Sequence, residues 1–140
     1  MHRQQVARWM THDVVSVPPD EPLFSALERM DEARIRHLLV RDHDRVVGVF
    51  SNRDVIRATL RFPDGRLHLH ETSVGEVMTP APLQTTSPEA SLGECADLML
   101  RHRISALPVY RDGELVGILT SNDVLRAASR DEHQGRRPDV

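Results

Sequence analysis

The chain contains no lysine: all 18 of its basic residues are arginine. It contains one cysteine, Cys95, which excludes an internal disulfide and indicates a reducing compartment. The sequence has no run of about 18 apolar residues, the length that a membrane-spanning helix needs. Its first 13 residues, "MHRQQVARWMTHD", have no apolar stretch long enough for a signal peptide. We therefore expect a soluble, cytoplasmic protein that makes no contact with a membrane.

Several functional classes also lack their signature in this sequence. There is no phosphate-cradling glycine loop, metalloprotease helix, CxxC pair or nucleophile elbow, so we do not expect an enzyme. The formal net charge of −3 disfavours nucleic-acid binding, which usually needs a basic surplus. Coding bias explains the exclusive use of arginine, although arginine also suits phosphate groups better than lysine does.

Hydrophobic residues make up 39% of the 140 residues, as in an ordinary globular protein, and the chain carries an internal repeat. A shift of 69 positions aligns residues 14–60 with 83–129 without a gap, and 13 of the 47 pairs are identical. "WMT" at 9–11 matches "VMT" at 77–79 with a shift of 68. Two copies of one structural unit follow from this alignment.

Each copy shows the same order of expected elements. A short leading helix, at 4–9 or 74–78, precedes a brief strand, an amphipathic helix, two apolar strands and a final helix. Ser73 and Glu76 have the spacing of a capping box. The fold class is therefore α+β, with two β-α-β-β-α repeats. The expected divisions are repeat 1 at 5–60, a linker at 61–72, repeat 2 at 73–129 and a flexible tail at 130–140.

Each repeat ends on a Ser/Thr-x-x-Asp pattern where a strand meets a helix. We call "SNRD", Ser51–Asp54, the first motif and "TSND", Thr120–Asp123, the second motif. As capping boxes, the motifs would satisfy the free amides of a helix N-terminus and do nothing else. As ligand sites, each aspartate could accept two hydrogen bonds from ribose hydroxyls, beside amides that favour anions. In the first motif, Arg53 could also reach a phosphate.

The "G-h-h-S/T-x-x-D" ending (h, hydrophobic), the "ISALPV" strand and the "VMT" lead-in together resemble CBS domains. The resemblance covers residues 5–129 and both copies. "SNRD" is also similar to the corresponding segment in the CBS pair of IMP dehydrogenases. "TTSP…HRISALPV" is close to the adenylate-sensing regulatory subunits of energy-sensing kinases. The resemblance implies two repeats packed sheet to sheet with pseudo-twofold symmetry and two clefts that commonly hold adenine nucleotides.

The family pattern implies which residues line each cleft. In cleft one, Asp54 would take the ribose, Ser51 and Arg53 the phosphates, and Ala81 and Ala106 the adenine edge. The whole implied set is Ser51, Arg53, Asp54, Ala81, Pro82, Ser105, Ala106 and Pro108. For cleft two, the implied set is Thr120, Asp123, Val14, Arg36, His37 and Leu39. Cleft one matches the family pattern more closely, because "IRHLLV" replaces "ISALPV" in cleft two and Asn122 stands where Arg53 does.

These features predict a regulatory module that senses AMP, ADP or ATP, with S-adenosylmethionine ranked behind them. The resemblance also implies a homodimer formed through the amphipathic helices, and the lack of an effector domain implies a protein partner that the sequence does not identify. The chief alternative is a ligand-free scaffold or stress-response interaction protein whose two motifs are only helix caps. A nucleic-acid-binding regulator that uses the arginines is a weaker alternative.

Four other residues needed a separate interpretation. His68 and His70 could share one face of an extended segment, but no further ligand is at a metal-binding spacing, so we expect no metal site. Cys95 lies on the apolar stripe of its helix and is interpreted as a core residue. For Trp9, a place at a dimer surface and a place in the core both remain open.

Overall fold

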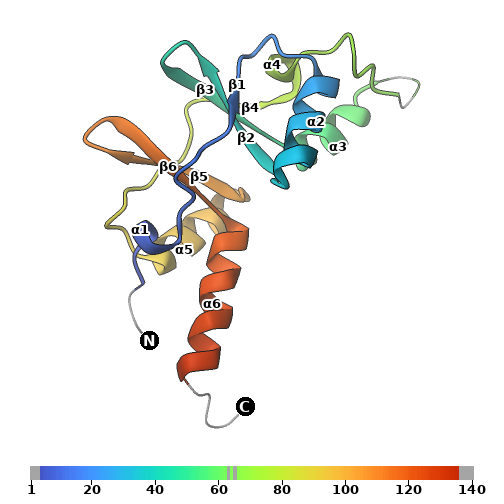
Figure 1. The fold of residues 1–140 in the computed structure, drawn as a ribbon. Helices are drawn as coiled ribbons and strands as arrows, with labels where there is room; N and C mark the ends of the chain where they lie inside the picture. The colour runs from blue at the N-terminus through green and yellow to red at the C-terminus, as the bar shows by residue number, and fades with distance from the viewer. Residues whose placement is uncertain (1–3, 63, 65, 136–140) are drawn as a thin grey trace. The chain divides into compact units, whose positions relative to one another are not determined.

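The computed structural model describes residues 4–62, 64 and 66–135, which fall into two compact units. Unit 2 comprises Val14–Leu83, whereas unit 1 combines the chain up to Asp13 with the chain from Gln84 onward. Each unit therefore contains the body of one repeat together with the leading helix of the other. Figure 1 shows the elements of both units.

Unit 2 is built on a four-stranded sheet in the order β1-β2-β3-β4. Strand β1 is parallel to β2, and the β2–β3 and β3–β4 pairs are antiparallel. The core residues of the unit come from the strands, from the helices and from the linker. The elements are β1 (Ser16–Val17), α2 (Leu23–Ala33), β2 (His37–Asp42), β3 (Arg45–Ser51), α3 (Asn52–Thr59), α4 (Val74–Val77) and β4 (Thr79–Pro80).

Unit 1 repeats this plan around the antiparallel pair β5–β6. A bridge between Thr11 and Ile118 takes the place of β4, and a bridge between Thr86 and Val109 takes the place of β1. The core includes Val6 and Met10 from the leading segment. The elements are α1 (Val6–Trp9), α5 (Leu92–His102), β5 (Ala106–Arg111), β6 (Glu114–Thr120) and α6 (Ser121–Gly135).

The amphipathic helices α2 and α5 form because their apolar residues recur at helical spacing. Helix α5 buries Leu92, Cys95 and Met99 on one face. The predicted capping box at α4 is confirmed: the Ser73 N–H donates to Glu76 Oε2 at 2.8 Å, and this hydrogen bond lowers the pKa of Glu76. A further capping box, Ser91 with Glu94, starts α5 and has the same S-x-x-E spacing as the one at α4.

Several boundaries differ from the expected ones. The first strand is limited to Ser16–Val17. Helix α6 extends to Gly135, five residues beyond Arg130, where the tail was expected to begin; residues 136–140 lie outside the described part. The linker packs onto unit 2, because the Phe24 N–H donates to the Leu69 carbonyl at 3.0 Å and the Leu69 side chain contacts the core.

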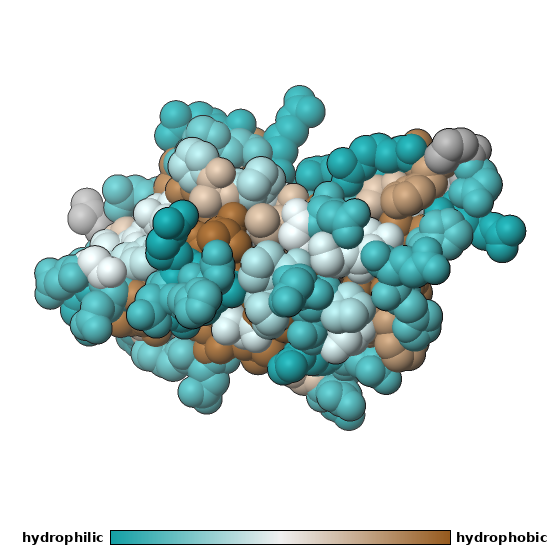
Figure 2. Space-filling model, turned by 90° about the horizontal axis from the view of Figure 1, so that it is seen from above, coloured by the Kyte–Doolittle hydropathy of each residue, from teal (hydrophilic) through white to brown (hydrophobic). Residues whose placement is uncertain are grey.

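None of the helices in the described part of the chain is long and apolar enough to cross a membrane. On the face shown in Figure 2, hydrophilic side chains break up the hydrophobic areas. Two large exposed apolar residues, Ile56 on α3 and Leu125 on α6, occupy equivalent positions in the two repeats.

Gly48 lets the segment that follows α4 approach strand β3 closely. A Cβ atom at this position would lie 2.7 Å from the Thr79 carbonyl oxygen and 2.5 Å from Met78 Sδ. Gly48→Ala is therefore expected to lower the free energy of unfolding by about 1–3 kcal/mol, because backbone atoms would have to move. Urea unfolding monitored by circular dichroism measures this change.

Gly93 on α5 provides the matched control for Gly48. A Cβ there would meet only Ser91 Oγ, at 3.9 Å. Gly93→Ala should therefore stabilise the protein by up to about 1 kcal/mol through helix propensity. Equal effects of the two substitutions would contradict the close approach at Gly48.

Candidate functional site

The first motif forms a complete capping box at the start of α3. The Ser51 N–H donates to Asp54 Oδ2 at 2.9 Å, and the Ser51 hydroxyl is 3.4 Å from the same oxygen. The other carboxylate oxygen, Oδ1, accepts a hydrogen bond of 2.9 Å from the Thr79 hydroxyl. Asp54 is 4% exposed, so its carboxylate is almost fully removed from water and is held by neutral donors on both oxygens.

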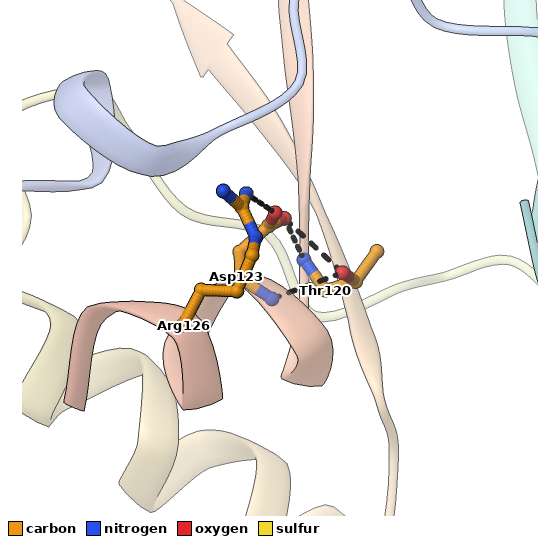
Figure 3. Close-up of polar contacts among 3 residues, drawn as sticks. All are labelled: Thr120, Asp123 and Arg126. Carbon is orange, nitrogen blue, oxygen red and sulfur yellow. Dashed lines mark hydrogen bonds and ion pairs between the residues drawn. The ribbon is translucent and has the colours of Figure 1, made fainter. Parts of the chain in front are cut away.

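The second motif has the same local geometry at the start of α6 (Figure 3). The Thr120 N–H donates to Asp123 Oδ2 at 2.8 Å, and the Thr120 hydroxyl donates to the same oxygen at 3.1 Å. Asp123 Oδ1 accepts from the Arg126 guanidinium at 2.6 Å. Asp123 is also 4% exposed.

The two carboxylates differ in what holds their Oδ1 atoms. Arg57, which aligns with Arg126 in the repeat, lies 3.6 Å from Asp54 Oδ1, where the Thr79 hydroxyl is the nearer donor. At Asp123 the charged donor is itself at hydrogen-bond distance. The first motif is therefore held mainly by a neutral hydroxyl and the second by a cation.

Sequence reasoning missed Thr79, Arg57 and Arg126 as residues of these sites. Two features of the sequence could have indicated these residues. Thr79 ends the "VMT" segment that matches "WMT", and Arg57 and Arg126 are one of the identical pairs of the repeat alignment. The alignment did not indicate that Thr79 would reach Asp54 across 25 residues.

The residues predicted for cleft one are divided between the two units. Unit 2 contains the first motif with Ala81 and Pro82, while Ser105, Ala106 and Pro108 belong to unit 1. The Ala81 N–H donates to the Val47 carbonyl at 2.9 Å. Within unit 1, Ala106 pairs with Thr120 in the β5–β6 register.

The residues predicted for cleft two are also divided, because Val14, Arg36, His37 and Leu39 belong to unit 2. Within that unit, His37 pairs with Ser51 in the β2–β3 register. Arg36 lies in a surface hollow of about 370 Å³ beside the first motif. The residues that line it are Leu27, Met30, Asp31, Arg34, Ile35, Arg36 and Asn52.

The other candidate residues have structural partners. The His68 ring lies edge-on to Phe62 with the ring centres 6.3 Å apart, and the His70 ring lies tilted against Phe24 with the centres 4.5 Å apart. Cys95 is fully buried, as expected for a core residue, and its burial raises the pKa of the thiol. Trp9 packs against the core of unit 1 and also lies beneath Arg126 and Arg130.

The CBS-domain family model matches the chain twice, at residues 6–61 and 74–130. The chain belongs to the CBS-domain family. It is a tandem CBS protein, as the motifs indicated, and the α+β fold expectation is confirmed. A crystal structure of a CBS domain superposes with a TM-score of 0.80 at 27% identity, covering 91% of this chain and 99% of that one.

Two further relatives bear on function. A crystal structure of CBSX2 in complex with AMP is 29% identical, has a TM-score of 0.71 and covers 91% of this chain and 97% of that one. An inosine-5'-monophosphate dehydrogenase from Korarchaeum cryptofilum is 34% identical over 91% of this chain and 26% of its own length. The chain spans less than half of the length of the first curated relatives that it matches. The CBS match is itself non-catalytic, which places this chain among regulatory CBS-pair modules.

Proposed function

We propose that this CBS pair is a sensor that binds an adenine nucleotide, AMP, ADP or ATP, with Asp54 as the ribose-binding residue. The observation that carries the proposal is the state of the Asp54 carboxylate. It is almost fully buried, and its Oδ1 accepts a hydrogen bond from the neutral Thr79 hydroxyl at 2.9 Å, with Arg57 farther away at 3.6 Å. A ribose hydroxyl offers the same kind of donor, so it can replace Thr79 without leaving a buried charge unpaired.

The surroundings of Asp54 supply groups for the rest of a nucleotide. Ser51 and the exposed Arg53 lie at the N-terminus of α3, where the helix dipole and a guanidinium favour phosphate. The Ala81 N–H is hydrogen-bonded to the Val47 carbonyl. The Ala81 carbonyl would accept a hydrogen bond from the adenine amino group. The AMP complex of the relative CBSX2 supports an adenine nucleotide as the ligand class.

The rival function, a ligand-free scaffold, also has support in the structure. Both motifs form capping boxes, so each aspartate already has a structural role. A cap of this kind contributes about 1 kcal/mol to stability without any ligand. Only a binding measurement separates the two functions.

Calorimetric titration with AMP, ADP, ATP, S-adenosylmethionine and 2′-deoxy-AMP tests the proposal. One of the ribonucleotides should bind, and 2′-deoxy-AMP should bind about 10–100-fold more weakly than AMP, because it lacks one hydrogen bond to a charged acceptor. Equal affinity for AMP and its deoxy analogue would contradict the role of Asp54. The absence of heat with every ligand would favour the scaffold.

Signalling from this module would require a second shape or a second protein. A ligand changes a conformational equilibrium only through its different affinity for the two states. We propose that the chain forms a homodimer and passes the signal to another protein or to the second subunit. Exposed Ile56 on α3 and Leu125 on α6 are apolar side chains that such an interface would cover.

A further inference from the structure

Arg57 and Arg126 occupy the same position in the two repeats but act differently on the neighbouring aspartate. The two arginine side chains are equally exposed, at 56% and 57%, and the aspartate side chains are 5% and 6% exposed. The distances nevertheless differ: 3.6 Å between Arg57 and Asp54, and 2.6 Å between Arg126 and Asp123. Burial therefore does not explain why Arg126 lies on its carboxylate and Arg57 lies farther away.

Trp9 accounts for the position of Arg126. The Arg126 guanidinium carbon lies 5.7 Å from the centre of the Trp9 ring, within the range of a cation–π interaction. The ring is itself held by a hydrogen bond of 2.7 Å from Trp9 Nε1 to Gln4 Oε1. In the "WMT"/"VMT" alignment, Val77 stands in the place of Trp9, so the first repeat has no aromatic face at this point to hold Arg57.

This difference between the arginines affects Oδ1, the outer carboxylate oxygen, of each aspartate. At both motifs Oδ2 is used by the capping box, so a ribose must take a place at Oδ1. At Asp54 it would compete for Oδ1 with a neutral hydroxyl, whereas at Asp123 it would compete with a guanidinium that also contacts the Trp9 ring. Charge-assisted hydrogen bonds are roughly twice as strong as neutral ones, so the second displacement is the more costly.

We propose that Arg126, held by Trp9, closes the second motif to a ribose, so that of the two motifs only the first takes a nucleotide in this chain. The proposal rests on the proposed function and adds its stoichiometry: one nucleotide per chain. It makes Arg126 a specificity-determining residue and Trp9 the residue that positions it. Two features accompany this asymmetry: tryptophan stands against valine in the leading segments, and the Thr79 hydroxyl occupies Oδ1 of Asp54.

Calorimetric titration with AMP and ATP, with the number of sites per chain as the readout, tests this inference. The wild-type chain should bind one nucleotide, and Arg126→Gln should bind two. Asp123→Asn added to Arg126→Gln should return the count to one. The matched control is Arg101→Gln, which removes an exposed arginine that pairs with Asp97 on α5 and should leave one site. Trp9→Val, which places valine in both leading segments, should also open the second site.

Trp9 is the single tryptophan of the chain and gives an independent readout. Nucleotide bound at the opened second motif of Arg126→Gln should alter Trp9 fluorescence, because the nucleotide takes the place of the guanidinium that contacts the ring. Two sites in the wild type, one unchanged site in Arg126→Gln, or loss of nucleotide binding in Arg126→Gln would each overturn the closure. If no nucleotide binds to the wild type or to any variant, the proposed function fails and the closure falls with it. If only the closure of the second motif is wrong, nucleotide will still bind, but the number of sites per chain will differ from the expected one.

Discussion

Asp54→Asn is expected to weaken nucleotide binding by about 100-fold, because hydrogen bonds from ribose to a charged acceptor would be lost. Asparagine keeps the shape of the side chain, and its amide oxygen can still accept from the Ser51 N–H, so α3 should still begin at the same place. Its amide nitrogen, however, donates rather than accepts and would face the ribose hydroxyls or Thr79. Calorimetric titration measures the affinity, and a thermal melt checks that the fold is kept.

Asp97→Asn is the matched control for this substitution. Asp97 is an exposed aspartate on α5 that pairs with Arg101 at 2.9 Å, an i,i+4 ion pair on the surface. Losing such a pair costs about 0.3–0.5 kcal/mol and should leave nucleotide affinity unchanged. If Asp54→Asn bound as tightly as wild type, Asp54 would be a cap and another residue would hold the ligand.

Leu107→Ala is expected to lower the free energy of unfolding by about 2–5 kcal/mol, the usual cost of a cavity left by a buried leucine. Leu107 lies on β5, is fully buried and belongs to the core of unit 1 with Val6, Cys95 and Leu119. The neighbouring Ala106 pairs with Thr120 of the second motif, so loosening this strand also loosens the second motif. Urea unfolding gives the free energy of unfolding and the urea concentration at the midpoint of the transition.

Two other leucines serve as comparisons for this prediction, one buried and one exposed. Leu38 is the repeat equivalent of Leu107 and is also fully buried, so Leu38→Ala should have an effect of the same size in unit 2. Leu100 on α5 is 80% exposed, and Leu100→Ala should change stability by less than about 0.5 kcal/mol. A loss below about 1 kcal/mol for both buried leucines would mean that the two cores are not packed as described.

Much of the fold was predictable because it depends on local sequence patterns. The amphipathic spacing of Leu92, Cys95 and Met99 predicted α5, and the apolar strands predicted β5 and β6. The capping boxes at Ser51, Ser73 and Thr120 follow from contacts between residues three positions apart. Such contacts form wherever the helix forms, so a sequence is enough to predict them.

The short strands were predicted less well, because their extent depends on tertiary pairing. Residues 83–86 have the composition of a strand, yet pairing there is limited to the Thr86–Val109 bridge. The linker was expected to be a separate segment, but Leu67 and Leu69 contact the unit 2 core. Their packing depends on an apolar surface that exists only after α2 and the sheet have assembled.

The sequence by itself determined the repeat, the α+β elements, the capping residues and the candidate aspartates, because each of these depends on spacing along the chain. Only the tertiary structure decided which residues hold the outer oxygens of the aspartates. Thr79 reaches Asp54 because the leading segment of the second repeat packs into unit 2, and Trp9 reaches Arg126 because the leading segment of the first packs into unit 1. A hydrogen bond or a cation–π contact requires atoms within a few ångströms, and folding, not spacing in the sequence, brings these residues together.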